Sequence, residues 1–301
     1  MPTGSFDTDF RDSIRLIRLQ SGRPDDPVVC DLLEVLLGDT DGVPYSALSY
    51  TWGDSSMTRS IRLDGAHFEV TSNLYGALHN LRRQTEDRYL WVDAVCIDQN
   101  NTNKRNHQVG QMRRVYQYAE SVIIWLGGST CDIDQLLDSV NDLDRRLLED
   151  EAPTKLVRVD RARYVWEWKI NSSAKDKEDF SRRSRYAMEA LLLRPWFNRI
   201  WVIQEAASAK TAAIACGQNS VPTRTFALMP ELLGITPHER ATALLEAMPG
   251  PLRRLSWWNE KPNLETLLRK FHGCDATDPR DKIYALLDPD ARCYERSDEA
   301  D

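Results

Sequence analysis

The sequence predicts a globular α/β fold with a parallel β-sheet at its core. Between residues 45 and 126, apolar segments typical of strands alternate with polar loops and amphipathic helices, which is the order of elements in α/β proteins. Residues 89–97 are nearly all apolar, as expected for a central parallel strand that is covered on both faces. Of the 301 residues, 42% are hydrophobic and 28% are charged, so the chain has enough apolar mass to form a core.

The N-terminal part is predicted to add strands to this core. Residues 13–19 alternate apolar side chains with arginines and predict an edge strand. Residues 28–37 predict a second strand, which pairs with the first as a hairpin across residues 22–26. Residues 1–12 are expected to be a loose lead-in, so residues 1–44 are assigned to N-terminal strands packed on the core.

The core is predicted to begin with a strand and a hairpin. Residues 45–50 predict the strand, and residues 61–70 predict the hairpin, because Asp64-Gly65 favours a tight turn. Ser72 or Asn73 is expected to cap the helix that follows. The apolar residues of that helix recur at helical spacing, and they are Leu74, Ala77, Leu78 and Leu81.

The next part of the core follows the order strand, loop, helix, strand. The central strand 89–97 leads into the polar loop 98–103, and a strand at 121–126 follows the helix after that loop. The residues expected on the inner face of this helix are Val109, Met112, Val115 and Tyr116.

The remaining segments are predicted to be mostly helical. Residues 129–180 are rich in charges of both signs and predict a helical insertion, after which helices at 186–193 and 199–209 and a strand at 211–216 resume the core. The predicted division of the chain is residues 1–44 as N-terminal strands, 45–216 as the core with the insertion at about 129–180, 217–290 as a helical C-terminal part of the same domain, and 291–301 as an acidic tail. Within the C-terminal part, helices are expected near 244–248, 264–271 and 280–287.

Composition and missing motifs exclude several classes of function. The net charge of −7 argues against nucleic-acid binding, and no apolar run approaches the roughly 20 residues needed to cross a bilayer. The N-terminus lacks a secretory signal. The six cysteines form no CxxC pair, which favours free thiols in a reducing compartment and therefore a cytoplasmic protein. Because phosphate-binding loops and histidine pairs at ligand spacing are absent, we expect no bound cofactor and no metal.

Polar side chains follow two of the predicted core strands. Trp52 and Asp54 follow the first strand, and Asp98 and Gln99 follow the central strand. Because ligands of parallel sheets bind at the carboxyl ends of the strands, these side chains could line one crevice. The alternative is that Trp52 packs against the sheet and that Asp98 caps the next helix.

A sharper signal lies between residues 198 and 205. Asn198 is expected to cap a helix in which Trp201 and Glu205, four residues apart, lie side by side on a flanking face. A carboxylate beside an aromatic ring suits glycosidic cleavage, because the ring can stack on a planar base while the carboxylate steadies an oxocarbenium-like centre. The alternative is a surface glutamate next to a half-buried tryptophan.

Several segments resemble one known family. Residues 45–54, 90–99 and 194–206 look like the three signature blocks of the fungal HET (heterokaryon incompatibility) domain. Residues 103–127 and 278–287 are similar to further parts of that domain. Because several multi-residue motifs occur in the family's order, the resemblance is specific. HET domains often lie at the N-terminus of longer proteins.

HET domains are in turn similar to TIR domains, so the resemblance implies a flavodoxin-like parallel sheet. Residues 201–205 resemble the W-x-x-x-E segment that carries the catalytic glutamate of TIR NAD glycohydrolases, which implies that Glu205 is catalytic. Val202 departs from this pattern, because plant TIR domains usually carry a cysteine there. The residues implied to contact the substrate are Tyr50, Trp52, Asp54, Asp93, Asp98, Gln99, Arg199, Trp201 and Gln204.

The resemblance also implies a biological role. A protein of this kind is a cell-death effector of non-self recognition that cleaves the nicotinamide–ribose bond of NAD⁺, with NAD⁺ as substrate and not as cofactor. It self-associates into the active form and acts with an incompatibility protein or an NLR-type partner. One alternative is a non-catalytic module that signals by oligomerisation. Another is a cysteine hydrolase that uses Cys96 with His107.

Overall fold

The computed structural model describes residues 13–38, 42–99, 101–149, 158–173, 177–260, 262–276 and 278–286. The chain divides into two compact units. The N-terminal unit contains Met1–Leu48 and Trp52–Ser121, and the C-terminal unit contains Ser49–Thr51 and Val122–Asp301. Both units combine strands with helices, which confirms the predicted α/β class. The predicted lead-in 1–12 and acidic tail 291–301 lie outside the described residues, and the predicted domain bounds stay a prediction.

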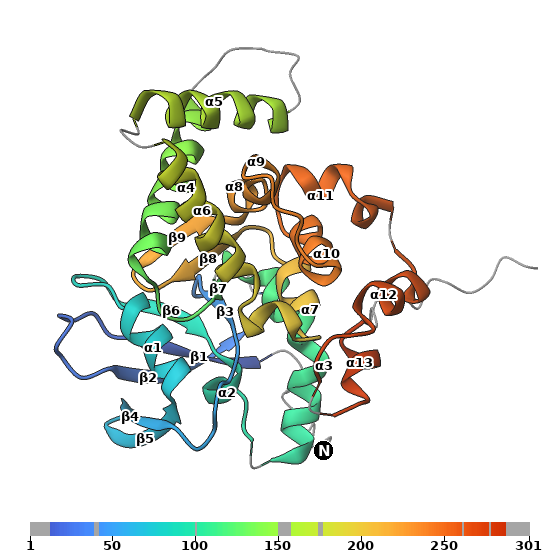
Figure 1. The fold of residues 1–301 in the computed structure, drawn as a ribbon. Coiled ribbons are helices and arrows are strands. Elements are labelled where there is room, and N and C mark those ends of the chain that lie inside the picture. Colours follow the sequence, from blue (N-terminus) through green and yellow to red (C-terminus); the bar gives the residue numbers. More distant parts are fainter. Residues whose placement is uncertain are drawn as a thin grey trace, which may run out of the picture. The chain divides into compact units, whose positions relative to one another are not determined.

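The strands of the N-terminal unit lie side by side in the order β5-β4-β2-β1-β6-β3 (Figure 1). They are β1 (Ser13–Leu19), β2 (Val29–Leu36), β3 (Ser46–Tyr50), β4 (Thr58–Leu63), β5 (Ala66–Thr71) and β6 (Arg88–Trp91). The predicted hairpin of the first two strands is confirmed, because β1 pairs antiparallel with β2 over its whole length. The prediction that β1 is an edge strand is wrong, because its other side pairs with β6. β3 pairs with β6 in parallel.

The second hairpin and the helix after it form as predicted. Asp64 and Gly65, which join β4 to β5, both have positive φ angles, as a tight hairpin turn requires. Helix α1 (Ser72–Leu81) buries the four apolar residues predicted for its inner face. Its cap is Thr71, whose side chain accepts a hydrogen bond from the backbone N–H of Leu74, so the predicted caps Ser72 and Asn73 are wrong.

The apolar run 89–97 does not form one long strand. β6 ends at Trp91, and the single-turn helix α2 (Asp93–Cys96) follows it. The Asp93 carboxylate accepts a hydrogen bond from the backbone N–H of Ala94 at 2.7 Å and so favours a helical turn there. Both a strand and a buried helix give a continuous apolar run, and this is why the sequence pattern did not separate them. The polar loop that follows leads into α3 (Thr102–Tyr118), whose Met112, Val115 and Tyr116 are buried as predicted, whereas the fourth predicted residue, Val109, is only half-buried.

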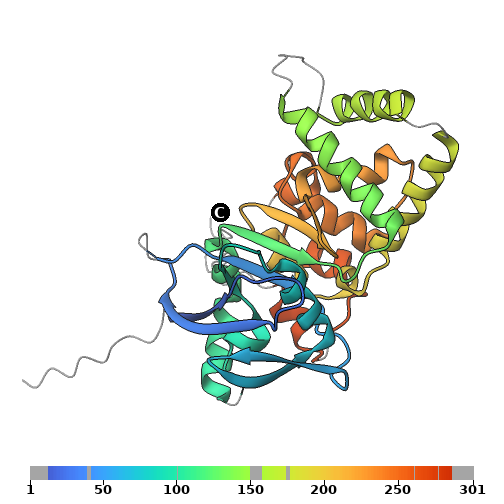
Figure 2. The ribbon, with the colours of Figure 1, turned by 90° about the vertical axis from the view of Figure 1, so that its left-hand side faces the viewer.

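The C-terminal unit contains a small mixed sheet in the order β7-β8-β9. Its strands are β7 (Ser121–Trp125), β8 (Ala212–Cys216) and β9 (Asn219–Pro222), and β7 pairs with β8 in parallel. The predicted helical insertion is present between β7 and the segment that carries Glu205. It consists of α4 (Cys131–Glu149), α5 (Arg158–Ser173) and the first residues of α6 (Lys177–Leu192). α4 packs against β9, α5 and α6, as Figure 2 shows from a second side.

The rest of the C-terminal unit is helical, and residues 217–286 are mostly helical as predicted, apart from β9. Its elements are η2 (Pro195–Asn198), α7 (Val202–Ala207), α8 (Thr223–Phe226), α9 (Met229–Leu232), α10 (Glu239–Ala247), α11 (Pro251–Leu255), η3 (Trp257–Glu260), α12 (Leu264–Phe271) and α13 (Asp281–Tyr284). α7 is shorter than predicted. Asn198 belongs to η2, and Trp201 precedes the first residue of α7, so the prediction that Asn198 caps this helix is wrong.

Asp142 ties α4 to α5. Its carboxylate accepts hydrogen bonds from Lys169 Nζ on α5 at 2.9 Å and from Arg146 Nε on α4 at 3.1 Å. Burial raises the pKa of Asp142, but the hydrogen bonds and charges of Lys169 and Arg146 outweigh it and lower the pKa from 3.8 to about 2. Because the pKa is lower in the folded chain, this stabilisation is complete above about pH 4 and is lost as the pH falls towards about 2.

We expect Asp142→Asn to lower the free energy of unfolding by about 2 kcal/mol at neutral pH, since it removes this ionised carboxylate. Urea denaturation at neutral pH and at two acid pH values measures the effect. The wild-type chain should lose more stability on acidification than the variant does. Asp138→Asn, an exposed position on the same helix, is the control and should keep the wild-type dependence on acid. If the stability of the wild type and that of Asp142→Asn fell equally on acidification, the stabilising role of the ionised Asp142 carboxylate would be contradicted.

The described cysteines are free thiols. Cys30, Cys96, Cys216 and Cys274 are buried and Cys131 is exposed, so the predicted lack of a disulfide framework holds for these five. Among the described residues, no helix combines the length and the apolar character that crossing a membrane would require.

Candidate functional site

Glu205 lies in the interior of the C-terminal unit, on the short helix α7 (Figure 1). Its side chain is only 1% exposed. The hydroxyl of Ser49, near the end of β3, donates a hydrogen bond to Oε2 of Glu205. The indole Nε1–H of Trp196, in η2, donates a hydrogen bond to Oγ of Ser49 over 2.7 Å. β3 and the later segment that contains η2 and α7, which are far apart in the sequence, are therefore joined through Ser49 at one buried carboxylate.

Two further predicted residues, Arg199 and Tyr50, lie beside this group. The guanidinium of Arg199 donates a hydrogen bond to the backbone carbonyl of Tyr50. The backbone around Arg199 is held by Asp275, whose carbonyl accepts a hydrogen bond from the N–H of Ile200 at 3.1 Å. The side chain of Tyr50 is buried, so its ring belongs to the core and offers no exposed stacking face.

Trp201 and Gln204 both contact α13. The indole Nε1–H of Trp201 donates to Oδ2 of Asp281 at 3.1 Å, and the Gln204 amide donates to the backbone carbonyl of Tyr284 at 3.1 Å. α13 belongs to the segment 278–287 that the sequence already singled out. Two of the predicted substrate contacts, one just before α7 and one on it, are therefore bonded to a later part of the same chain.

The expected arrangement of Trp201 and Glu205 is wrong in one respect. They are joined within one turn, because the N–H of Glu205 donates to the carbonyl of Trp201 at 3.3 Å. Their side chains nevertheless differ in depth, since Trp201 is half-buried and Glu205 is buried. Glu205 is therefore neither a member of a flanking-face pair nor a surface glutamate.

A second group of predicted residues lies in the N-terminal unit. The indole Nε1–H of Trp52 donates to Oδ2 of Asp93 at 2.8 Å, and Oδ1 of Asp93 accepts from the backbone N–H of Ala94. Trp52 is 48% exposed, whereas Asp93 is buried. The edge of the Trp52 ring is thus fixed while much of its face is open to solvent. The alternative that the rest of the Trp52 ring packs against the sheet stays open.

The other predicted residues of this unit lie on loops. Asp54 accepts hydrogen bonds from the hydroxyl and the backbone N–H of Ser56, and these bonds lower the pKa of its carboxyl. Asp98 and Gln99 follow α2 and do not directly follow a strand, with Asp98 half-buried and Gln99 exposed. The predicted residues therefore form two groups, one in each unit, and a single crevice that contains them all stays a prediction.

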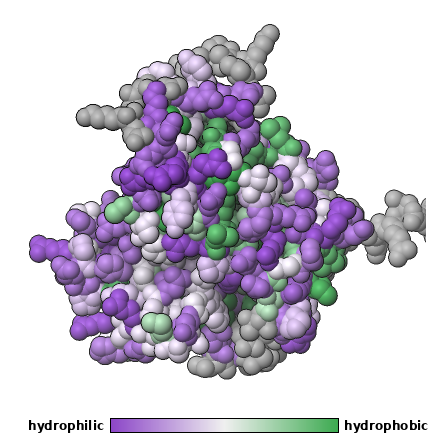
Figure 3. Space-filling model, viewed as in Figure 1, coloured by the Kyte–Doolittle hydropathy of each residue, from purple (hydrophilic) through white to green (hydrophobic). Residues whose placement is uncertain are grey.

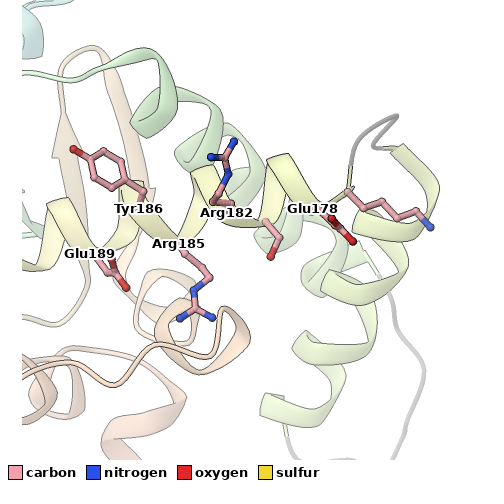
Figure 4. Close-up of a pocket in the computed structure, with 7 residues that line it drawn as sticks. Glu178, Arg182, Arg185, Tyr186 and Glu189 are labelled. Carbon is pink, nitrogen blue, oxygen red and sulfur yellow. The ribbon is translucent and has the colours of Figure 1, made fainter.

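Two surface hollows of the C-terminal unit lie away from Glu205. The first lies along α6, and Figure 4 shows its side chains spread along the helix without converging on one point. Its lining residues are Lys177, Glu178, Ser181, Arg182, Arg185, Tyr186 and Glu189. The second lies between α4 and α5 and is lined by Arg146, Glu149, Tyr164, Val165 and Trp168. Both are open and shallow, so neither indicates an active site.

The cysteine-hydrolase alternative does not fit the structure. Cys96 is fully buried, and this burial raises the pKa of its thiol to about 12. The thiolate that a nucleophile requires is therefore disfavoured. Among the described residues, no cluster of three histidine, cysteine, aspartate or glutamate side chains could hold a metal ion.

Sequence reasoning missed Ser49 and Trp196. Ser49 is a polar residue near the end of an otherwise largely apolar strand, and that position is the signal that could have identified it. Trp196 lies in segment 194–206, which resembles a signature block of the HET domain, but nothing in the spacing of Trp196 connects it to Ser49. Their contact depends on the tertiary fold.

Comparison with known proteins gives a family and one relative. A family model for the heterokaryon incompatibility protein (HET) matches residues 45–205. The chain is 28% identical over 295 residues to the heterokaryon incompatibility protein 6, OR allele, of Neurospora crassa, an alignment that covers 81% of this chain and 42% of that protein. The chain thus spans less than half the length of this relative. No solved structure matches the chain.

Proposed function

Because the chain belongs to the heterokaryon incompatibility (HET) family, we propose that it acts in fungal non-self recognition as a cell-death effector. The matched region, residues 45–205, contains Ser49, Trp196 and Glu205. The relative is named for heterokaryon incompatibility, which supports the same role. Such a role involves an incompatibility protein or an NLR-type partner.

We propose further that the effector activity is cleavage of the nicotinamide–ribose bond of NAD⁺ and that Glu205 is the catalytic carboxylate. The observation that carries this proposal is the burial of Glu205 beside a neutral hydroxyl donor. Burying a carboxylate costs free energy, so a buried carboxylate that no structural reason explains is a candidate for a functional role. A carboxylate in a dry environment is well suited to stabilise a developing positive charge.

Glu205 has one role in the proposed reaction. As the N-glycosidic bond breaks, its electron pair leaves with the neutral nicotinamide, and positive charge develops on the ribose ring. The Glu205 carboxylate stabilises this oxocarbenium-like centre. Water then adds to the same ribose carbon and loses a proton, which gives ADP-ribose.

Access to Glu205 requires a rearrangement, because the side chain is only 1% exposed. The contacts of Trp201 and Gln204 with α13 cover part of α7 and are the contacts that must open. Self-association is the event proposed to drive this opening. Figure 3 shows hydrophobic side chains reaching the surface of the C-terminal helices, and Leu193, Leu255 and Ile283 are each more than half exposed.

Nicotinamide release from NAD⁺ tests the enzymatic proposal. The full chain is incubated with NAD⁺ in dilute, concentrated and crowded solution, together with Glu205→Gln and the control Glu265→Gln, an exposed position on α12. We expect Glu205→Gln to lower the rate by roughly 10²–10³-fold, because the charge that stabilises the transition state is lost. Urea denaturation of each variant checks that it is folded before its rate is compared with that of the wild type.

The control should keep the wild-type rate. If the wild-type chain released no nicotinamide above the blank in any of these solutions, the enzymatic proposal would be overturned. Full activity of Glu205→Gln would show that another residue is responsible.

The burial of Glu205 also supports one other function. A carboxylate that stays closed to solvent acts as a structural group, and the module then signals by oligomerisation without catalysis. In that case Glu205→Gln keeps the ability to trigger cell death in a fungal host, whereas the enzymatic proposal expects that ability to be lost.

A further inference from the structure

The hydrogen bonds around Glu205 have a defined direction. An indole N–H can only donate, so at the 2.7 Å contact with Trp196 the Ser49 oxygen must accept. The single hydroxyl proton of Ser49 is then directed to its other neighbour, Oε2 of Glu205. That carboxylate oxygen is therefore held as an acceptor.

The donor at the start of this series is itself fixed in place. Trp196 is 1% exposed and packs edge-on against Phe197, with ring centroids 5.1 Å apart and an interplanar angle of 88°. Both residues lie in η2, where the N–H of Phe197 donates to the carbonyl of Arg194 at 3.1 Å. Because the indole cannot turn without opening this packing, its N–H stays directed at Ser49.

We propose that Ser49, oriented by Trp196, is a positioning residue that holds the Glu205 carboxylate in its acceptor orientation. The proposal deepens the function above and rests on it, because this orientation matters for cleavage only if Glu205 stabilises the ribose cation. Ser49 is 0% exposed, so water cannot replace the hydroxyl as the donor. A hydrogen bond to a carboxylate is stronger than one to a neutral acceptor, so the Ser49 hydroxyl fixes the direction of this oxygen firmly.

A spectroscopic double-mutant cycle tests the hydrogen bonds without any use of activity. The full chain is labelled with ¹⁵N-tryptophan, and the indole resonance of Trp196 is assigned by its loss in Trp196→Phe. We expect Glu205→Gln to shift this resonance when Ser49 is present and to leave it unchanged in the Ser49→Ala background. Ser49→Thr keeps the hydroxyl and should restore the shift.

The matched control is Ser46→Ala. Ser46 lies on the same strand, but its hydroxyl contacts that of Ser121 at 3.1 Å, so its removal should leave the Trp196 resonance coupled to Glu205. The proposal would be overturned if Glu205→Gln did not shift the Trp196 indole resonance when Ser49 is present. It would also be overturned if Glu205→Gln shifted this resonance equally in the Ser49→Ala background.

Steady-state kinetics give the second readout. We expect Ser49→Ala to lower kcat about tenfold with KM unchanged, and Ser49→Thr to recover most of the rate, because Ser49 acts on the orientation of Glu205 and does not touch the substrate. Trp196→Phe tests the same role of Ser49 from its other neighbour. It removes the indole donor and should also lower kcat while KM stays constant. If the wild type cleaves NAD⁺ and Ser49→Ala keeps its full kcat, the positioning role is overturned while the proposed function stands. Absence of cleavage by the wild type overturns the proposed function, and the spectroscopic cycle still decides whether Ser49 orients Glu205.

Discussion

Trp196→Ala is expected to lower the free energy of unfolding by about 3–5 kcal/mol. The side chain is fully enclosed and packs edge-on against Phe197, so its removal leaves a cavity that the short segment η2 cannot close. The variant also deprives the buried Ser49 hydroxyl of its donor. Urea denaturation followed by circular dichroism measures the loss.

Trp168→Ala is the matched control for this experiment. Trp168 is 48% exposed and packs below the guanidinium of Arg146, 4.8 Å from the ring centroid. Its replacement removes this contact and little buried area, so the loss should be about 1 kcal/mol or less. Losses of equal size for the two variants would show that Trp196 is not a rigid part of the core.

Asp144→Ala is expected to lower the free energy of unfolding by about 2–3 kcal/mol. Asp144, on α4, is buried and accepts two parallel hydrogen bonds from the guanidinium of Arg224 at 2.9 and 2.8 Å, together with one from the hydroxyl of Thr225. Without the carboxylate, the buried Thr225 hydroxyl loses this acceptor and Arg224 loses its ion pair. The expected loss in the free energy of unfolding is smaller than the loss for a fully buried ion pair, because the side chain of Arg224 is 40% exposed and can be hydrated.

The control for this prediction lies on the same helix. Asp132 forms an ion pair with Arg183, but both side chains are partly open to water. Solvent weakens such a pair, so Asp132→Ala should be much less destabilising than Asp144→Ala. A thermal or urea unfolding series on both variants measures the difference. A result in which Asp132→Ala is the more damaging change would contradict this account of α4.

The elements that the sequence predicted well are those with a clear local pattern. β1 and the β4–β5 hairpin follow from alternation and from the Asp64-Gly65 turn, and α12 follows from its amphipathic spacing. Where a pattern fits two structures, the prediction failed. The apolar run 89–97 fits both a buried strand and a buried helix, and the structure divides it between β6 and α2.

Neighbour relations were harder to predict than the elements themselves. The alternation of β1 could not show that β6 would pair with its second side. The short strand β9 has four residues and ends in proline, which leaves almost no periodic signal. Both features depend on which distant segments the folded chain brings together.

The candidate site shows the same limit. The spacing of Trp201 and Glu205 correctly placed them one turn apart, but spacing does not fix the depth of a side chain below the surface. Glu205 was identified through a family resemblance, whereas its hydrogen-bond partner Ser49 lies 156 positions away in the sequence. No local rule connects these two positions.

The hydrogen bonds from Trp201 and Gln204 to α13 have a consequence for the affinity of a ligand. A ligand that uses the indole N–H of Trp201 or the amide of Gln204 competes with Asp281 and Tyr284 for those groups. Its observed dissociation constant equals the intrinsic one divided by the fraction of molecules in which α13 has moved aside. Under the proposed function, substitutions in residues 278–286 therefore change the observed dissociation constant of the ligand while leaving Glu205 in place.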